Sequence, residues 1–173
     1  MTTSNKYSFE KFYGKGVFID TELLIVLLIG AYKRSLIGQG CTANYTLDDY
    51  NLLYAFLSKF KYKYVSQPIL TEAFFHLFEG NKKIEKGYQE EFIKDTLDIL
   101  VINLNESYSE KKFTLENKRV IDLGFADINS VECCLKNDLL LLTKDAGLCR
   151  YANEKELEYV SFDYLRELAG FFD

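Results

Sequence analysis

Residues 16–30 read GVFIDTELLIVLLIG, an apolar run interrupted by two acids, Asp20 and Glu22. Residues 16–20 are rich in β-branched side chains and begin at a glycine, which predicts a short buried strand. Residues 21–35 are apolar on nearly all sides, which predicts a deeply buried helix. An apolar strand and an apolar helix would fold without carboxylates, so the acids at their junction indicate a role beyond folding.

The composition is that of an ordinary globular domain. The chain has 173 residues, of which 48% are hydrophobic and 27% charged, enough for one domain with a sizeable core. We expect a loose polar and aromatic lead-in over residues 1–15 and a single domain over residues 16–173. The formal net charge is −5, so a nucleic acid would need a local basic patch or a bound cation to approach the protein.

Cysteine, histidine and hydropathy narrow the functional classes. The four cysteines form no CxxC pair and His76 is the single histidine, which argues against zinc sites, disulfide frameworks and most Ser–His or Cys–His nucleophiles. The apolar run over residues 23–31 is well below the roughly 20 residues that span a bilayer, and the acids before it are unlike a secretion signal. These patterns predict a cytoplasmic protein with reduced thiols and no membrane partner.

Strand and helix patterns alternate along the rest of the chain. Thr46 is a typical helix N-cap, Pro68 suits the first position of a helix, and Gly124 marks a turn. Further strands are predicted over residues 61–67, 99–104, 138–143 and 157–162, and further helices over residues 46–60, 69–80, 82–98, 105–122, 123–137, 144–152 and 163–171. Alternation of this kind predicts an α/β protein with three α/β/α layers and a central, mostly parallel sheet.

Four acids fall where such a sheet binds ligands, beyond the carboxyl ends of its strands. Asp20 ends the first strand, and Asp145 lies two residues past the strand predicted over 138–143. Asp127 lies at the start of the helix after Gly124, and Glu72 lies in the first turns of the helix over 69–80, on the side opposite its apolar stripe. Each acid alone is equally consistent with capping a helix or favouring its N-terminus.

Carboxylates that converge at one edge would repel one another unless a hard divalent cation bound among them. We therefore predict a metal site there. Glu22, His76, one helical turn beyond Glu72, and Thr143, close to Asp145, are candidate supporting residues. A surface histidine is the simpler explanation for His76, and Thr143 is also explained as a β-branched residue that ends a strand. Lysines and tyrosines in the segments 59–64 and 82–88 could contact a phosphate backbone, and solvated charge is the alternative.

The chain resembles a PIN domain. The resemblance is carried by the segments VFIDTELL, PILTEAFFHL, LGFADINSVECC and LLLLTKDAGL, which occur in the family's order and extend over about residues 16–165. It implies an α/β/α fold and a metal-dependent ribonuclease, as in the VapC-type toxins. It also implies that Asp20, Glu72, Asp127 and Asp145 form the catalytic acidic quartet, with Asp20 and Asp127 as direct ligands of Mg²⁺ or Mn²⁺.

The resemblance further implies an RNA substrate, a candidate antitoxin protein as partner and a homodimer. Two departures from the family pattern stand out. Glu22 occupies a position where Asn or Ser is frequent, which adds a negative charge beside the site. Phe75 and His76 replace a frequent Ser-Asn pair, which leaves the substrate contacts open.

Two other functions compete with the ribonuclease. One is a non-catalytic PIN-like RNA-binding or scaffold protein with a weakened acidic site. The other is a haloacid-dehalogenase-like phosphatase, because VFID followed by a helix is similar to that family's nucleophile strand. That family usually has a second Asp two residues after the first, whereas this chain has Glu22.

Overall fold

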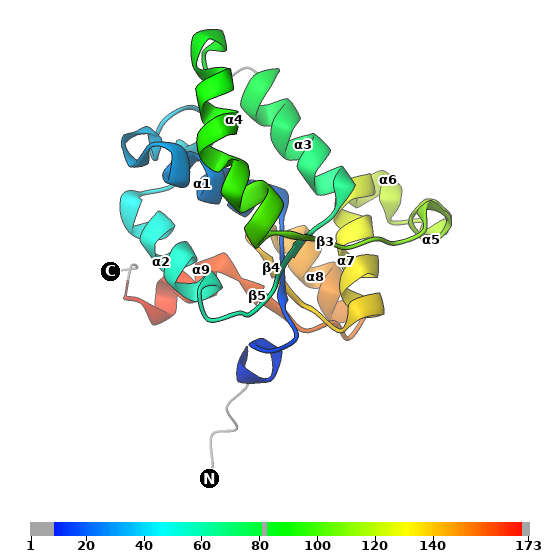
Figure 1. Cartoon of the computed structure of the whole chain (residues 1–173). Helices are drawn as coiled ribbons and strands as arrows, with labels where there is room; N and C mark the ends of the chain where they lie inside the picture. The colour runs from blue at the N-terminus through cyan, green and yellow to red at the C-terminus, as the bar shows by residue number, and fades with distance from the viewer. Residues whose placement is uncertain (1–8, 81–82, 171–173) are drawn as a thin grey trace.

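One parallel sheet forms the centre of the molecule (Figure 1), in a computed structural model that describes residues 9–80 and 83–170. Every neighbouring pair of strands is parallel, and the strand order is β3-β2-β1-β4-β5. The strands are β1 (Val17–Ile19), β2 (Lys63–Val65), β3 (Asn105–Glu106), β4 (Leu140–Thr143) and β5 (Tyr159–Ser161).

Helices cover both faces of this sheet, which confirms the predicted α/β/α class. One group packs around α1 (Thr21–Tyr32) and contains α2 (Leu47–Leu57), α3 (Gln67–Phe78) and α4 (Gln89–Asp98). The other contains α5 (Lys111–Glu116), α6 (Val120–Leu123), α7 (Phe125–Asn137) and α8 (Ala146–Glu154), with α7 against β4 and α8 against β5. The last helix, α9 (Phe162–Leu168), contacts β5 and α2. Within the described ranges, no helix combines the length and the apolar character that a bilayer crossing needs.

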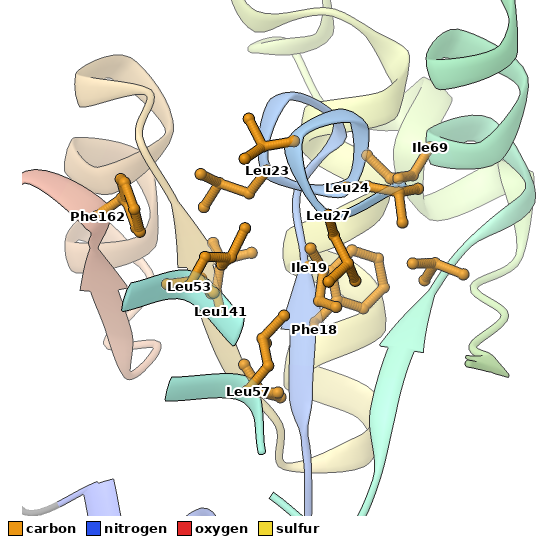
Figure 2. Packing of buried hydrophobic residues seen from close by; sticks show 14 of the residues in the cluster. Phe18, Ile19, Leu23, Leu24, Leu27, Leu53, Leu57, Ile69, Leu141 and Phe162 are labelled. Carbon is orange, nitrogen blue, oxygen red and sulfur yellow. The ribbon is translucent and has the colours of Figure 1, made fainter. Parts of the chain in front are cut away.

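The predicted strand and helix of residues 16–35 form the middle of the core. Every residue of β1 is buried, and α1 is buried continuously from Leu23 to Gly30. Figure 2 shows Leu23, Leu24 and Leu27 of α1 above Phe18 and Ile19 of β1, with side chains from neighbouring elements around them. A helix enclosed by other helices on one side and by the sheet on the other can be apolar all round.

The predicted cap at Thr46 is confirmed as a capping box that is also tied to the C-terminal helix. The Asp49 amide donates to Thr46 Oγ1 (3.2 Å) and the Thr46 amide donates to Asp49 Oδ2 (2.7 Å). Arg166 of α9 then forms a bidentate pair with the Asp49 carboxylate, at 2.7 and 2.9 Å. This pair lowers the pKa of Asp49 against the effect of its burial and fixes α9 on α2.

The strand predicted over residues 99–104 is wrong. Residues Ile99–Asn103 form a π-helix, η5, that continues α4, and the strand β3 follows it. Val101 and Ile102 are 69% and 73% exposed, so this apolar run is not buried in the sheet. A short apolar run has no periodicity that separates a strand from a helical turn, and the preceding helix decided the outcome.

Several predicted helix boundaries also differ. The helix predicted over residues 105–122 is instead β3 followed by the separate short helices α5 and α6. The helix predicted over 82–98 begins only at Gln89, after the 3-10 turn η4 (Lys86–Tyr88), and Lys82 lies outside the described residues. Pro68 is the second residue of α3, not the first.

Part of the expected lead-in belongs to the core. Residues Phe9–Phe12 form a 3-10 helix, η1, and Phe12 is only 3% exposed. The Phe9 ring meets the Phe56 ring of α2 edge to face, with centroids 5.9 Å apart. Residues 1–8 of the lead-in lie outside the described residues. Two further 3-10 turns, η2 (Arg34–Leu36) and η3 (Gly40–Thr42), connect α1 to α2.

We expect Gly30→Ala to destabilise the protein, although this exchange inside a helix normally stabilises by roughly 0.5–1 kcal/mol. A Cβ at residue 30 would lie 2.2 Å from the Tyr50 ring of α2, so α1 and α2 would have to move apart at a cost of about 1–3 kcal/mol. Urea denaturation measures the change in unfolding free energy. In a Tyr50→Leu background the penalty should disappear; an equal penalty in both backgrounds would contradict the packing described here.

Candidate active site

The strand order changes direction between the neighbouring strands β1 and β4, which makes this the topological switch point of the sheet. From β1 the chain moves to β2 on one side, whereas β4 lies on the other side of β1 and leads on to β5. Asp20 is the N-cap of α1, which follows β1, and Asp145 is the N-cap of α8, which follows β4. In open α/β sheets the crevice at such a point is the usual place for a ligand.

A cleft of about 670 Å³ lies at the carboxyl ends of β1 and β4, and all four predicted acids line it; we call it the acidic cleft. Asp20 comes from the end of β1, Glu72 from α3, Asp127 from the first turn of α7 and Asp145 from the start of α8. The structure thus brings together carboxylates that are far apart in the sequence. The supporting candidates Glu22 and His76 also line the cleft, together with Thr21, Ile25, Cys41, Phe75, Glu79 and Gly80.

Asp20 is held by two hydrogen bonds in a nearly closed environment. The residue is only 6% exposed. Its Oδ1 accepts a hydrogen bond from the Thr21 amide (2.7 Å), and its Oδ2 accepts one from the Thr143 hydroxyl (2.5 Å). Burial raises the pKa of Asp20 to about 6, the two hydrogen bonds oppose that rise, and the charges of Glu72 and Asp145 add to it. The carboxylate is therefore fixed in position yet costly to keep charged.

Thr143 does not line the cleft, but its hydroxyl connects two of the acids. It donates to Asp20 and accepts from the Asp145 amide at 3.0 Å. Asp145 Oδ1 accepts in turn from the Leu148 amide (2.6 Å), which caps α8. The same side chain therefore positions the end of β1 and the start of α8 relative to each other.

Thr21 holds Glu72 by a hydrogen bond from its hydroxyl, as Thr143 holds Asp20. The Thr21 hydroxyl donates to Glu72 Oε2 at 2.7 Å and so joins α1 to α3 across the cleft. The sequence reasoning missed this residue. Its signal was the position directly after Asp20, where a hydroxyl on the first turn of α1 faces the same edge of the sheet.

Asp127 is a partly buried carboxyl among other acids. Its pKa is raised to about 7, mainly by burial and then by the charges of Asp20, Asp145 and Glu72. No hydrogen bond to its side chain occurs within residues 9–80 and 83–170. Near neutral pH a partly buried carboxyl of this kind is divided between its neutral and charged forms.

Glu22 lies beside a buried tyrosine. Burial raises the pKa of Tyr45, and the nearby Glu22 carboxylate adds to the rise. On the Tyr45 ring, Lys144 Nζ lies 4.7 Å from the centroid. Tyr45 therefore lies between an acid that lines the cleft and a lysine that does not.

The donor set fits a hard divalent cation. Carboxylate oxygens are the ligands that Mg²⁺ and Mn²⁺ prefer, and Mg²⁺ usually takes only one or two of them and keeps several waters. Within the described part of the chain no group of three or more His, Cys, Asp or Glu side chains is arranged so that it could hold a metal ion, so any cation here would have at most two such protein ligands. Burial first, and the charges of neighbouring acids second, raise the pKa values of Asp20 and Asp127, so the charged forms of both carboxyls are costly in this cleft.

No family model matches the chain, and no curated protein matches it. The geometry of the cleft and the sequence motifs therefore carry the functional argument.

We expect Thr143→Val to destabilise the protein by about 1–3 kcal/mol, because the Asp20 carboxylate and the Asp145 amide each lose a buried partner. The pKa of Asp20 should rise above its wild-type value, since the hydroxyl that opposes the effect of burial is gone. Urea denaturation and carboxyl carbon-13 titration by NMR measure the two effects. Thr143→Ser keeps the hydroxyl and is the control; if it behaved like the valine variant, the hydrogen bonds would not be the cause.

The metal-free protein should lose stability as the pH rises from about 4 to about 7. The folded pKa values of Asp20 and Asp127 lie above the ordinary 3.8, so the folded state binds more protons than the unfolded state in this interval. Asp127→Asn removes part of this dependence. The stability of the variant relative to wild type, measured by denaturation in chelator, should therefore increase with pH; a constant difference would contradict the raised pKa of Asp127.

Proposed function

We propose that this protein is a metal-dependent ribonuclease of the PIN-domain type that hydrolyses RNA phosphodiester bonds. The observation that carries the proposal is the cleft at the carboxyl edge of the sheet, lined by Asp20, Glu72, Asp127 and Asp145 from four separate elements. Crowded carboxylates destabilise a fold unless a ligand compensates them, so their presence here favours a function that uses a cation.

Asp20 and Asp127 would hold Mg²⁺ or Mn²⁺. When bound, the cation supplies positive charge that offsets the carboxylates and the phosphate of the substrate, and it lowers the pKa of water. This role suits a protein of net charge −5, whose overall field repels RNA.

The chain's own residues fix the acids and leave oxygens available. Thr143 and the Thr21 amide hold Asp20, so that its carboxylate does not reorient when the cleft fills. Thr21 occupies only Oε2 of Glu72, and the Leu148 amide occupies only Oδ1 of Asp145. The second oxygens of Glu72 and Asp145 are the candidate acceptors for a proton from attacking water.

The proposal extends to the biological setting. A PIN-type ribonuclease of this size would act in the cytoplasm, and a toxin role would add a small antitoxin protein as partner. A homodimer, which the resemblance implies, is the further partner that we propose.

Asp20→Asn should abolish cleavage of defined RNAs in the presence of Mg²⁺ or Mn²⁺. The metal-free variant should be about as stable as wild type, because asparagine is also a good N-cap and the charge lost is a costly one. Gel assays with Mn²⁺ or EDTA measure cleavage. In wild type, Mn²⁺ should also raise the melting temperature, since it binds only the folded state, and the variant should show a smaller rise.

Asp95→Asn is the matched control, because Asp95 lies exposed on α4 and lines neither the acidic cleft nor its neighbours. A fully active Asp20→Asn enzyme would reject the assignment. Absence of metal binding by wild type would favour the scaffold function. An aspartyl-phosphate trapped at Asp20 with a small phosphate monoester would favour the phosphatase.

A further inference from the structure

A second depression lies beside the acidic cleft and shares one wall with it, formed by α3. It has a volume of about 890 Å³, and both Glu72 and Phe75 of α3 line the two cavities. Its other walls come from the segment after β3 and from the start of α7; Figure 1 shows α3 beside α7 and the α5–α6 segment on this side of the molecule. A ligand in the acidic cleft could therefore continue into this depression, which we call the aromatic groove.

Aromatic rings from three separate elements line the aromatic groove. Phe75 of α3, Tyr108 after β3 and Phe125 at the start of α7 are 57%, 68% and 38% exposed. Lys136 Nζ donates to the Tyr108 carbonyl at 3.2 Å and lies 5.6 Å from the centroid of its ring. Tyr108 is thus anchored with a large ring area exposed, a combination that suits stacking on a flat ligand.

Neutral polar groups form another part of the lining. Ser66, Ser107 and Asn129 line the groove and are all buried. The Ser107 hydroxyl accepts from the Asn137 side chain at 3.0 Å. The Ser66 hydroxyl has no hydrogen-bond partner among the described residues, although Ser66 is at the N-cap position of α3. Buried hydroxyls are normally paired, so this one indicates a polar ligand or water in the groove.

The charges of the two cavities differ. The acidic cleft carries the four quartet acids together with Glu22 and Glu79, whereas the groove has Glu72 at the shared wall, Glu106, and the single cation Lys111 within its described lining. Lys136 lies beside this lining, next to Tyr108. Two glutamates and two lysines offset one another, so an anionic group would meet little net attraction in the groove. A flat, neutral ring with hydrogen-bonding edges fits the aromatic faces and the polar lining best.

We propose that the aromatic groove binds an unpaired nucleobase of the RNA strand whose phosphate occupies the acidic cleft. This inference rests on the proposed ribonuclease function and adds a base-binding subsite formed by Phe75, Tyr108 and Phe125. Stacking on aromatic side chains is tolerant of sequence and needs a base that is free of its duplex. Phe75, shared by the two cavities, lies where the base and the adjacent phosphate would meet.

Binding is measured in the Asp20→Asn background, so that the RNA stays intact. The probes are a fluorescein-labelled unstructured oligoribonucleotide and the same backbone with consecutive abasic residues, followed by fluorescence anisotropy at fixed salt. Tyr108→Ala should weaken binding of the base-containing probe by roughly 5- to 100-fold and leave binding of the abasic probe unchanged. Tyr108→Phe should bind as tightly as the parent, because it keeps the ring.

Tyr54→Ala is the matched control, since Tyr54 is also a largely exposed tyrosine, at 59%, but lies on α2 outside both cavities. Equal weakening of both probes by Tyr108→Ala, or no weakening of either, would overturn the proposal. Ser66→Ala gives an independent arm: weaker binding of the base-containing probe with no loss of melting temperature supports the groove, and unchanged binding argues against Ser66 as a contact.

Activity separates this inference from the function on which it rests. With otherwise wild-type enzyme, Tyr108→Ala should raise KM for single-stranded RNA more than it lowers kcat. Identical cleavage by wild type and Tyr108→Ala would contradict the groove proposal but not the ribonuclease proposal. Absence of metal-dependent cleavage by wild type would contradict the ribonuclease proposal. In that case the anisotropy assay would still decide whether the groove binds a base.

Discussion

Asp20 is a carboxylate almost fully withdrawn from water at the point where two central strands end, and the groups that compensate it set the geometry around it. The Thr21 amide and the Thr143 hydroxyl hold its two oxygens. The Thr143 hydroxyl also accepts the Asp145 amide, and the Thr21 hydroxyl holds Glu72. Two threonines thus hold three acids in position relative to one another: one directly after β1, one on α3 and one directly before α8. A buried carboxylate must find hydrogen-bond donors or lose its charge.

The rest of the fold supplies the rigidity that this arrangement needs. An all-round apolar α1 lies between the sheet and three helices, so the N-terminus that bears Asp20 cannot shift without disturbing the core. The acids themselves oppose folding, as the raised pKa values of Asp20 and Asp127 show. A stable core combined with an electrostatically unfavourable cleft is typical of a site kept for function.

In the function that we propose, the two cavities would contribute different parts of the recognition of an RNA strand. The acidic cleft repels a polyanion until a cation compensates its charge, and it offers little surface for a base. The aromatic groove has exposed rings and neutral polar groups but little net charge. Phe75 and Glu72, which line both, connect the two. The family pattern has small polar residues near Phe75, so this part of α3 is where the chain departs from its resemblance and where its own substrate preference would arise.

The sequence by itself determined the α/β class, the strand and helix of residues 16–35 and the cap at Thr46, because each depends on a local pattern of hydropathy or capping. The same patterns placed the four acids at strand ends and helix starts. Local patterns failed over residues 99–122, where the apolar run ILVIN continued α4 and the strand fell on Asn105–Glu106. Only the tertiary structure decided that Thr21 and Thr143 hold the acids and that Tyr45 lies near Glu22. It also decided that three aromatic residues line one groove: Phe75, Tyr108 and Phe125. These contacts join residues that are distant in the chain, and the crossing of the helices over the sheet, which no local pattern encodes, brings them together.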